Sequence, residues 1–336
     1  MKTLAVLLPT YNCAIFLEEA VQSILGQTFR DFDLFVFDDC STDNTFEIIN
    51  RFNDKRIFYY KNDKNLGLST TLNIGLELLL PSYEFIARMD ADDWCDPTRF
   101  EKQLSFLTKN PQYALCGTQG YWLKDLKLTP DSGWRYPTSD HYLRIYLLFA
   151  ASFGHSSLIL RSHVFLVENY RYNDLIQTCE DWDLWTRIAP KYAIANLPEF
   201  LMKYRIMPNS NHRSIENQEI HVRERTAVIA AYFNSFQFPI SQKNVFDFFY
   251  NLEIVNSKNF YENLNLWITV FNKLFKATQN RLSVDEQKNF SFMMARKIKF
   301  FIQKNDLSVF KTRTWFYVFS RTKFIGFYRL LKSQIF

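Results

Sequence analysis

The chain has 336 residues, of which 47% are hydrophobic and 18% aromatic, so it is long enough for one large domain with an appended region. Its five cysteines form no Cys-x-x-Cys pair, which argues against a disulfide framework or a zinc site and favours a reducing compartment. The net charge of +5 is uneven: residues 1–214 carry 22 Lys+Arg against 26 Asp+Glu, and residues 215–336 carry 18 against 9. This split suggests two regions with different partners.

The first third of the chain alternates between strand-like and helix-like patterns. In chain order these patterns predict the strand Leu4–Leu8, the helix Ala14–Leu25, the strand Leu34–Phe37, the helix Thr45–Phe52, the strand Ile57–Tyr60, the helix Leu68–Leu80, the strand Phe85–Met89 and the helix Thr98–Thr108. Ser41-Thr42-Asp43 and Asp96-Pro97 are the expected helix caps. The alternation indicates an α/β fold, a mostly parallel sheet with helices on both faces.

The pattern changes beyond Ile215, where helical periodicity continues without strand alternation and Phe, Tyr, Asn and Lys dominate. We therefore expect two domains, a sheet-containing domain over residues 1–214 and a mainly helical, basic and aromatic region over 215–336. The boundary is expected near Arg213–Glu219.

The sequence predicts no targeting or membrane-spanning segment. The apolar run before Pro9 is too short for the core of a signal peptide. The most apolar later stretch, Ile145 to Leu160, contains Gly154 and His155 and is too short to cross a bilayer. We expect a cytoplasmic protein, soluble or peripheral to the membrane.

Polar side chains follow three of the predicted strands. Pro9-Thr10-Tyr11-Asn12 follows the first, Asp38-Asp39 the second and Asp90-Ala91-Asp92-Asp93 the fourth. Ligands of such sheets bind outside the carboxyl ends of the strands. These segments therefore predict a ligand site at one edge of the sheet, although any single residue could be a helix cap or a turn residue.

The aspartates after the fourth strand are the densest acidic group of the chain. Carboxylates so close together repel one another, and a divalent cation that holds a diphosphate is the expected partner. On an extended backbone Asp90 and Asp92 would point to opposite sides, one toward a nucleotide and one toward the metal. The alternative is a solvated acidic loop, with Asp96 as a helix cap.

The motifs also resemble a known family, in the order in which that family has them. The matching segments are Leu8-Pro9-Thr10-Tyr11-Asn12, Phe37 to Thr45, Asn65-Leu66-Gly67-Leu68, Leu72-Asn73-Ile74-Gly75, Ile86 to Asp93, His155-Ser156-Ser157, Cys179 to Trp185 and Tyr204-Arg205. With them the chain resembles family 2 glycosyltransferases, which are inverting enzymes with the GT-A fold. The likeness covers roughly residues 1–214.

The resemblance implies transfer of a sugar from a nucleoside diphosphate sugar, expected to be a UDP-sugar, with Mn²⁺ or Mg²⁺ as cofactor. Asp92 is the implied metal ligand, and Asp90 lies near the ribose. Asp93 is either a second metal ligand or a partner of Arg88. Arg88 itself either reaches the nucleotide or forms a buried salt bridge.

The nucleobase is expected to lie against the first two strand ends. By resemblance Asp39 accepts a hydrogen bond from the uracil N–H, and Tyr11 offers an aromatic surface. Pro9 and Thr10 belong to the same nucleotide-binding segment, although Thr10 could simply end its strand. Cys40 stands where the family usually has glycine, which suggests a less permissive backbone rather than thiol chemistry.

Inversion needs a base that takes the proton of the acceptor hydroxyl. By resemblance this base is Asp181, with Glu180 as the fallback; the alternative is that Asp181 only caps a helix. Trp182 offers either an acceptor-facing aromatic surface or core packing. His155 matches a position on the acceptor side and is otherwise a structural, hydrogen-bonded residue.

The clearest departure from the family is at Met207, where many relatives have a histidine that binds metal or diphosphate. A thioether is a poor partner for a hard cation. His212 could substitute, or Arg205 or Arg213 could neutralise the diphosphate.

The last residues, 307–336, interleave basic and aromatic side chains and contain no acidic residue. Such a segment suits an anionic membrane surface, at the inner face of the cell membrane, or packs on the catalytic domain; both remain open. No nucleic-acid recognition motif accompanies it, so no nucleic acid is expected as a partner.

The resemblance implies a glycan or lipid-linked acceptor in bacterial surface polysaccharide synthesis, such as lipopolysaccharide or capsule. A metal-dependent nucleotidyltransferase is the alternative enzyme, although Pro9-Thr10-Tyr11-Asn12 is not the glycine- and lysine-rich phosphate loop that it would need. A catalytically silent, membrane-associated scaffold of the same fold is the alternative without activity.

Overall fold

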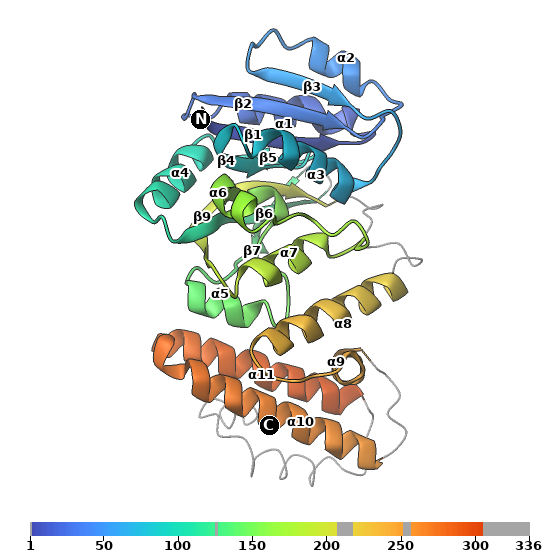
Figure 1. The fold of residues 1–336 in the computed structure, drawn as a ribbon, viewed down its shortest axis with the longest axis vertical. Coiled ribbons are helices and arrows are strands. Elements are labelled where there is room, and N and C mark those ends of the chain that lie inside the picture. Colours follow the sequence, from blue (N-terminus) through green and yellow to red (C-terminus); the bar gives the residue numbers. More distant parts are fainter. Residues whose placement is uncertain (1, 125–126, 207–217, 251–256, 305–336) are drawn as a thin grey trace. The chain divides into compact units, whose positions relative to one another are not determined.

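The computed structural model describes residues 2–124, 127–206, 218–250 and 257–304 (Figure 1). The chain divides into two compact units, Met1–His221 and Val222–Phe336, and each is described by itself. The predicted domain boundary, between residues 214 and 215, lies outside the described residues and stays a prediction.

The first unit is built on one mixed sheet. Its strand order is β3-β2-β1-β4-β8-β6-β9-β5, with β7 beside β6. The strands are β1 Lys2–Thr10, β2 Phe32–Asp38, β3 Ile57–Lys61, β4 Tyr83–Arg88, β5 Trp94–Cys95, β6 Tyr113–Lys124, β7 Lys127–Trp134, β8 Ile159–Arg161 and β9 Ala193–Arg205. The four predicted strands, β1 to β4, pair in parallel, whereas β8 runs antiparallel between β4 and β6.

Helices cover both faces of this sheet, which confirms the predicted α/β class. They are α1 Ala14–Leu25, α2 Thr45–Asn50, α3 Leu68–Leu79, α4 Arg99–Lys109, α5 Asp140–Tyr146, the 3₁₀ turn η1 His155–Ser157, α6 Ser162–Val167 and α7 Glu180–Ile188. Leu4, Val6 and Leu8 share a core with α1 and α4. Leu7, on the opposite face of β1, lies so close to α3 that a Cβ on Gly75 would meet its side chain at 2.3 Å.

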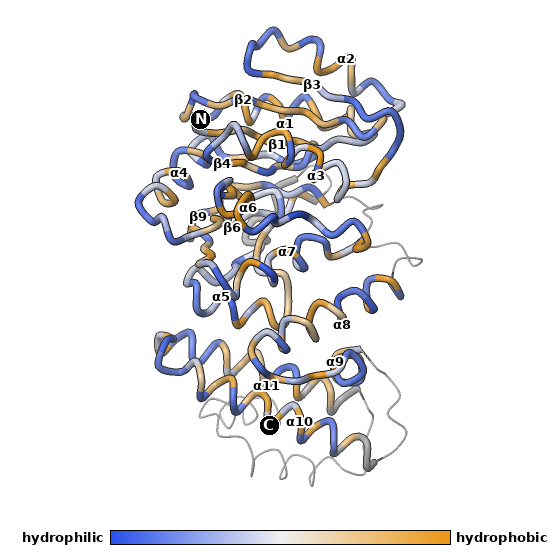
Figure 2. The backbone as a smooth tube through the Cα atoms, viewed as in Figure 1, coloured by the Kyte–Doolittle hydropathy of each residue, from blue (hydrophilic) through white to orange (hydrophobic). Residues whose placement is uncertain are grey.

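The buried strands β1 and β2 appear as hydrophobic stretches of the backbone tube (Figure 2). Strands covered on both faces need such continuous apolar sequences, which is why the pattern was readable. Their carboxyl ends meet, since Thr10 is in register with Asp38 and Leu7 with Arg88.

Two predicted helix caps shift along the chain. Asp43 accepts hydrogen bonds from the backbone N–H groups of Thr45 (3.1 Å) and Ala14 (2.9 Å), so it serves the starts of two helices. The prediction that Asp96 is an N-cap was wrong by two residues, since α4 begins after Thr98. Asp96 instead accepts hydrogen bonds from the backbone (2.9 Å) and the hydroxyl (2.7 Å) of Thr98, while its own N–H bonds Leu201 in β9.

The described part of the second unit is helical, as predicted. Its elements are α8 Gln218–Ser235, which begins in the first unit, α9 Gln242–Phe249, α10 Ser257–Thr278, η4 Gln279–Arg281 and α11 Val284–Lys304. An aromatic core joins α9, α10 and α11, in which Phe248 stacks on Trp267 at 4.6 Å between ring centroids and Phe260 on Phe301 at 5.1 Å. Among the described helices, none has the length and apolar character needed to cross a membrane. The predicted membrane segment 307–336 lies outside the described residues.

Candidate functional site

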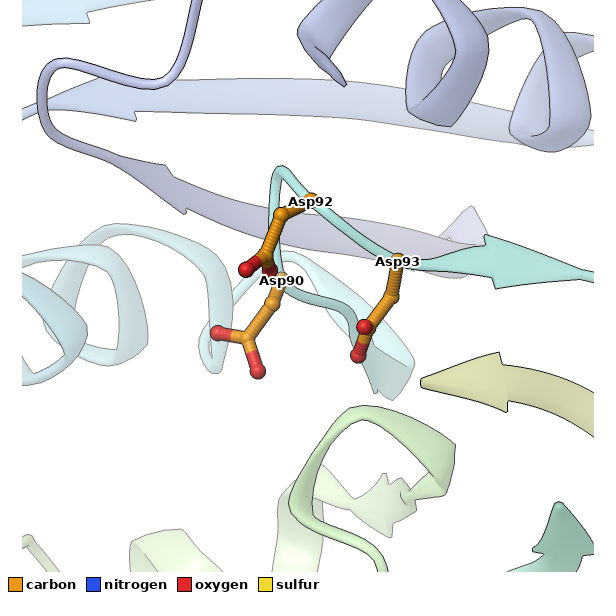
Figure 3. Close-up of side chains that lie close together, drawn as sticks. All are labelled: Asp90, Asp92 and Asp93. Carbon is orange, nitrogen blue, oxygen red and sulfur yellow. The ribbon is translucent and has the colours of Figure 1, made fainter. Parts of the chain in front are cut away.

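Three carboxylates meet in the loop between β4 and β5. Their oxygen atoms lie within 4.8 Å of one another, and Figure 3 shows Asp90, Asp92 and Asp93 projecting toward the same side. The expectation that Asp90 and Asp92 point to opposite sides was wrong. The backbone here forms a turn, in which Asp93 N–H donates to the carbonyl of Asp90 (3.3 Å), so the alternation of an extended strand does not apply.

Arg88 holds one member of this cluster. Arg88 is 1% exposed, and its guanidinium forms an ion pair with Asp90. Ser156 in η1 completes the arrangement: its hydroxyl accepts from Arg88 Nη1 (2.9 Å) and from Asp90 N–H (3.2 Å), and donates to Asp90 Oδ2 (2.7 Å). The salt bridge left open for Arg88 is thus present, with Asp90 rather than Asp93 as its partner. A contact of Arg88 with the nucleotide stays a prediction.

Asp93 is held by Arg205, the last residue of β9. Its Oδ1 accepts a hydrogen bond from the backbone N–H of Arg205 (3.0 Å), and the Arg205 side chain donates to the carbonyl of Asp92 (3.0 Å). The same guanidinium pairs with Glu19 (2.8 Å) and lies over the ring of Phe16. Arg205 is 5% exposed and holds the aspartate loop through these contacts, and its role in neutralising a diphosphate stays a prediction.

Burial and mutual repulsion make this cluster hold protons tightly. Burial, and then the charge of Asp90, raise the pKa of Asp92 to about 6. Burial, followed by the charges of Asp92 and Asp90, raises the pKa of Asp93 well above its usual range. Such shifts mark a carboxylate group that lacks a matching positive charge.

A second carboxylate pair opens α7. Cys179 occupies the N-cap, so Asp181 lies inside the first turn of the helix, where its Oδ1 accepts from the N–H of Trp182 (2.6 Å). Burial, and then the charge of Asp181, raise the pKa of Glu180 to about 8. Arg88 and Asp90 also act electrostatically on Glu180.

His155 lies beside this second pair. Its Nδ1 is 3.8 Å from Glu180 Oε1, and its Nε2 is 2.8 Å from the hydroxyl of Tyr172. Since Ser156 contacts Arg88 and Asp90, two of the three residues of η1 join the two carboxylate groups in one site: His155 touches Glu180, and Ser156 touches Asp90. His155 thus has the structural contacts that the sequence left open, and its position on the acceptor side stays a prediction.

On the nucleotide side, the predicted residues differ in exposure. Tyr11 is 50% exposed and presents an aromatic ring, whereas Pro9 and Thr10 are buried at the end of β1. Asp39 is 5% exposed: Oδ1 accepts from Asn62 (2.9 Å) and Leu66 (2.8 Å), and Oδ2 accepts from Gly67 (2.8 Å). Asp39 therefore orders the loop before α3, and its contact with a base stays a prediction.

Cys40 has φ +66°, a left-handed conformation that glycine adopts without strain. The cysteine thus retains the backbone conformation of a glycine position.

Similarity to known proteins agrees with this geometry. Residues 5–165 match the family described as Glycosyl transferase family 2. An uncharacterized glycosyltransferase of Haemophilus influenzae is 31% identical over 229 residues, which cover 64% of this chain and 68% of that protein. The O-antigen biosynthesis glycosyltransferase WbnJ of Escherichia coli is 30% identical over 228 residues, which cover 63% and 82%.

This chain belongs to glycosyltransferase family 2. Solved structures agree with the fold: TarS residues 1–349 of S. aureus, in complex with UDP-GlcNAc, is 16% identical with a TM-score of 0.56, covering 90% of this chain and 88% of that one. The mannosyltransferase PcManGT of Pyrobaculum calidifontis, in complex with GDP-Man and Mn²⁺, is 14% identical with a TM-score of 0.51, covering 90% and 86%. At this identity the likeness shows the fold alone.

One predicted site residue of this family 2 glycosyltransferase lies in its core. Trp182 is 2% exposed, and its indole N–H donates to the carbonyl of Leu147 (2.9 Å). It has no free face, so the prediction of an acceptor-facing surface was wrong and the core-packing alternative describes it. Leu184 and Trp185 of the same helix are buried as well.

The glycosyltransferase offers a donor set that fits a hard divalent cation. All three groups are oxygen ligands, and among the described residues Asp93 Oδ2 is buried with no hydrogen-bond partner. The guanidinium of Arg88 pairs with Asp90. None of the ion pairs found in the described residues joins a basic side chain to Asp92 or Asp93. Met207, His212 and Arg213, the other candidates near the metal or diphosphate, lie outside the described residues.

Two further residues contact this site, Ser156 through Asp90 and Tyr172 through His155, and Asn73 contacts Tyr172. Ser156 and Asn73 stood inside motifs quoted for the family but had been given no role. Tyr172 has no sequence signal, because it lies in a loop and its contacts are made only by folding.

The raised pKa values predict an unusual pH dependence of stability. In the folded, metal-free enzyme the pKa values of Glu180 (about 8) and Asp92 (about 6) exceed their ordinary values of 4.5 and 3.8. The folded state therefore binds these protons before the unfolded state does, so the free energy of unfolding rises as pH falls from about 8 to about 5. Calorimetry in EDTA should show this rise, and saturating Mn²⁺ should reduce it, because metal and proton compete for Asp92. A melting temperature that falls as the pH is lowered from about 8 to about 5 in EDTA would contradict the raised pKa values of Glu180 and Asp92.

Proposed function

We propose that this glycosyltransferase transfers a sugar, with inversion, from a UDP-sugar to a hydroxyl of a glycan or lipid-linked acceptor in bacterial surface polysaccharide synthesis. The observation that carries the proposal is the pairing of two carboxylate groups in one site. One, Asp90 with Asp92 and Asp93, suits a metal-bound diphosphate, and the other, Glu180 with Asp181, suits proton abstraction. η1 touches both.

Each residue has a role in the proposed reaction. Asp92 and Asp93 would hold Mn²⁺ or Mg²⁺, which when bound offsets the negative charge of the departing diphosphate. Asp181 takes the proton of the acceptor hydroxyl as that hydroxyl attacks the anomeric carbon. Tyr11 stacks on the base, while Arg88 keeps the Asp90 carboxylate in place near the ribose.

Two lines support the acceptor class. Two similar proteins carry names that refer to surface polysaccharides: WbnJ is named for O-antigen biosynthesis, and AmsE of Erwinia amylovora for amylovoran biosynthesis. The excess of basic residues in 215–336 suits an anionic acceptor or membrane surface. Residues 1–214 would form the cytoplasmic catalytic domain, and the basic region would bring it to the inner face of the membrane.

A donor screen tests the proposal. The full chain is incubated with UDP-glucose, UDP-galactose, UDP-GlcNAc, UDP-GalNAc and GDP-mannose, with Mn²⁺ or with EDTA, and nucleotide release is measured. We expect Mn²⁺-dependent UDP release from one UDP-sugar, and a product of inverted anomeric configuration by proton NMR. In a parallel incubation with nucleoside triphosphates, release of pyrophosphate would favour the nucleotidyltransferase. Silence with every donor, together with no nucleotide binding by calorimetry, would favour the scaffold.

A further inference from the structure

A carboxamide on α3 fixes a loop almost a hundred residues later in the chain. Asn73 Oδ1 accepts from the backbone N–H of Tyr172 (2.9 Å), and Asn73 Nδ2 donates to the carbonyl of Tyr172 (2.9 Å) and to Asp174 Oδ1 (2.9 Å). One side chain thus satisfies both backbone groups of Tyr172. The segment between α6 and α7 has no regular helix or strand, so its position depends on contacts of this kind.

Tyr172 carries this placement to the catalytic carboxylates. Its side chain is 3% exposed, and its hydroxyl is 2.8 Å from His155 Nε2. Burial raises the pKa of Tyr172 far above its ordinary value, so the phenol keeps its proton and can donate it to Nε2. When the phenol donates, the proton of a neutral His155 resides on Nδ1, which faces Glu180 Oε1 at 3.8 Å.

We propose that Asn73, Tyr172 and His155 form a hydrogen-bonded relay that positions the Glu180–Asp181 pair for proton abstraction. Asn73 and Tyr172 are positioning residues, which act through His155 and touch neither donor nor acceptor. The proposal deepens the proposed function and rests on it, because it assumes that the base belongs to this pair. The charged groups that act on both Tyr172 and Glu180 are Arg88, Asp90 and Asp181, and Glu180 also acts on Tyr172.

The arrangement also differs from ordinary core packing. Tyr170, two residues earlier, is buried as well, but its hydroxyl donates to the carbonyl of Arg187 (3.1 Å), away from His155. The two tyrosines thus lie in one loop, each with one hydroxyl hydrogen bond, and differ in whether that bond reaches the site. Tyr170→Phe is therefore the matched control for Tyr172→Phe.

Kinetics separate the two tyrosines. Tyr172→Phe should lower kcat by about 3- to 10-fold, which is the effect of one hydrogen bond, and leave the donor KM unchanged. Tyr170→Phe should leave kcat within about twofold of the unmodified enzyme. Asn73→Ala should lower kcat further and raise the acceptor KM, because the whole loop loses its anchor. An unchanged kcat in Tyr172→Phe, or an equal fall in Tyr170→Phe, would overturn the relay.

A readout without substrate keeps this test separate from that of the proposed function. Nitrogen-15 NMR of the imidazole should show the Nδ1–H tautomer for His155 in the unmodified enzyme and a mixture of tautomers in Tyr172→Phe. The Nε2–H tautomer in the unmodified enzyme would refute the relay whatever the activity. If the unmodified enzyme shows the expected tautomer but transfers no sugar, the proposed function fails and the hydrogen-bond chain stands.

Discussion

Replacing Asp181 with asparagine is expected to abolish sugar transfer while leaving UDP and Mn²⁺ binding intact. The substitution keeps the size of the side chain and the oxygen that accepts from Trp182 N–H, but removes the carboxylate that takes the acceptor's proton. Loss of a general base lowers the rate by about 10²- to 10⁴-fold. Transfer rates and calorimetric titration with UDP and Mn²⁺ measure the two properties on the same sample.

Asp183→Asn is the matched control, two residues along the same helix. Asp183 pairs with the half-exposed Arg187 at 2.8 Å, and pairs of this kind contribute only about 0–1 kcal/mol, so its rate should stay near that of the unmodified enzyme. Near-normal transfer by Asp181→Asn would exclude Asp181 as the base. If Glu180→Gln lost transfer instead, the fallback assignment to Glu180 would hold.

The second large effect is expected for Asp92→Asn. The variant should lose Mn²⁺ binding in the presence of UDP, and its rate should fall on the order of 10³-fold, since metal ions supply several kcal/mol of charge stabilisation and each 1.36 kcal/mol is tenfold. The metal-free variant should also melt at a higher temperature, because a half-buried carboxylate repelled by Asp90 has been removed. A gain in stability with a loss of activity distinguishes this variant from one that misfolds.

Asp96→Asn provides the comparison in the same acidic segment. An asparagine there retains the oxygen that Asp96 offers to the backbone and hydroxyl of Thr98, so metal affinity and rate should be nearly unchanged. Unaltered Mn²⁺ affinity in Asp92→Asn would refute the metal assignment. Equal losses in both variants would point to general disruption of the segment.

The sequence predicted much of the fold because its first strands are covered on both faces. Continuous apolar runs such as Leu4–Leu8 can only be buried strands or buried helix segments, and the helices between them decide for strands. Helix α1 occupies its predicted bounds, Ala14–Leu25. Strands β5 to β9 are not predicted, since they carry no comparable run of apolar residues.

The site was predicted less completely, because several of its contacts arise only on folding. The turn at Asp90–Asp93 overrides strand alternation, and the contact of Arg205 with Asp93 spans 112 positions of sequence. Trp182 sits next to a candidate base, yet the apolar side of α7 takes it into the core. The carboxylates could be identified because they are adjacent in the sequence. Which of their neighbours can face a ligand is decided by the folded structure.

The tie between Arg205 and the aspartate loop also bears on the order of events in synthesis. The aspartates emerge from the ribosome with the first strands, but β9, which neighbours the edge strand β5 and bears Arg205, is made about a hundred residues later. Until then nothing from β9 can hold the acidic loop in its turn. We therefore expect the acidic loop of the nascent chain to lack its metal-binding conformation until β9 is made. Metal affinity and catalytic activity should then arise together, in one late step of co-translational folding.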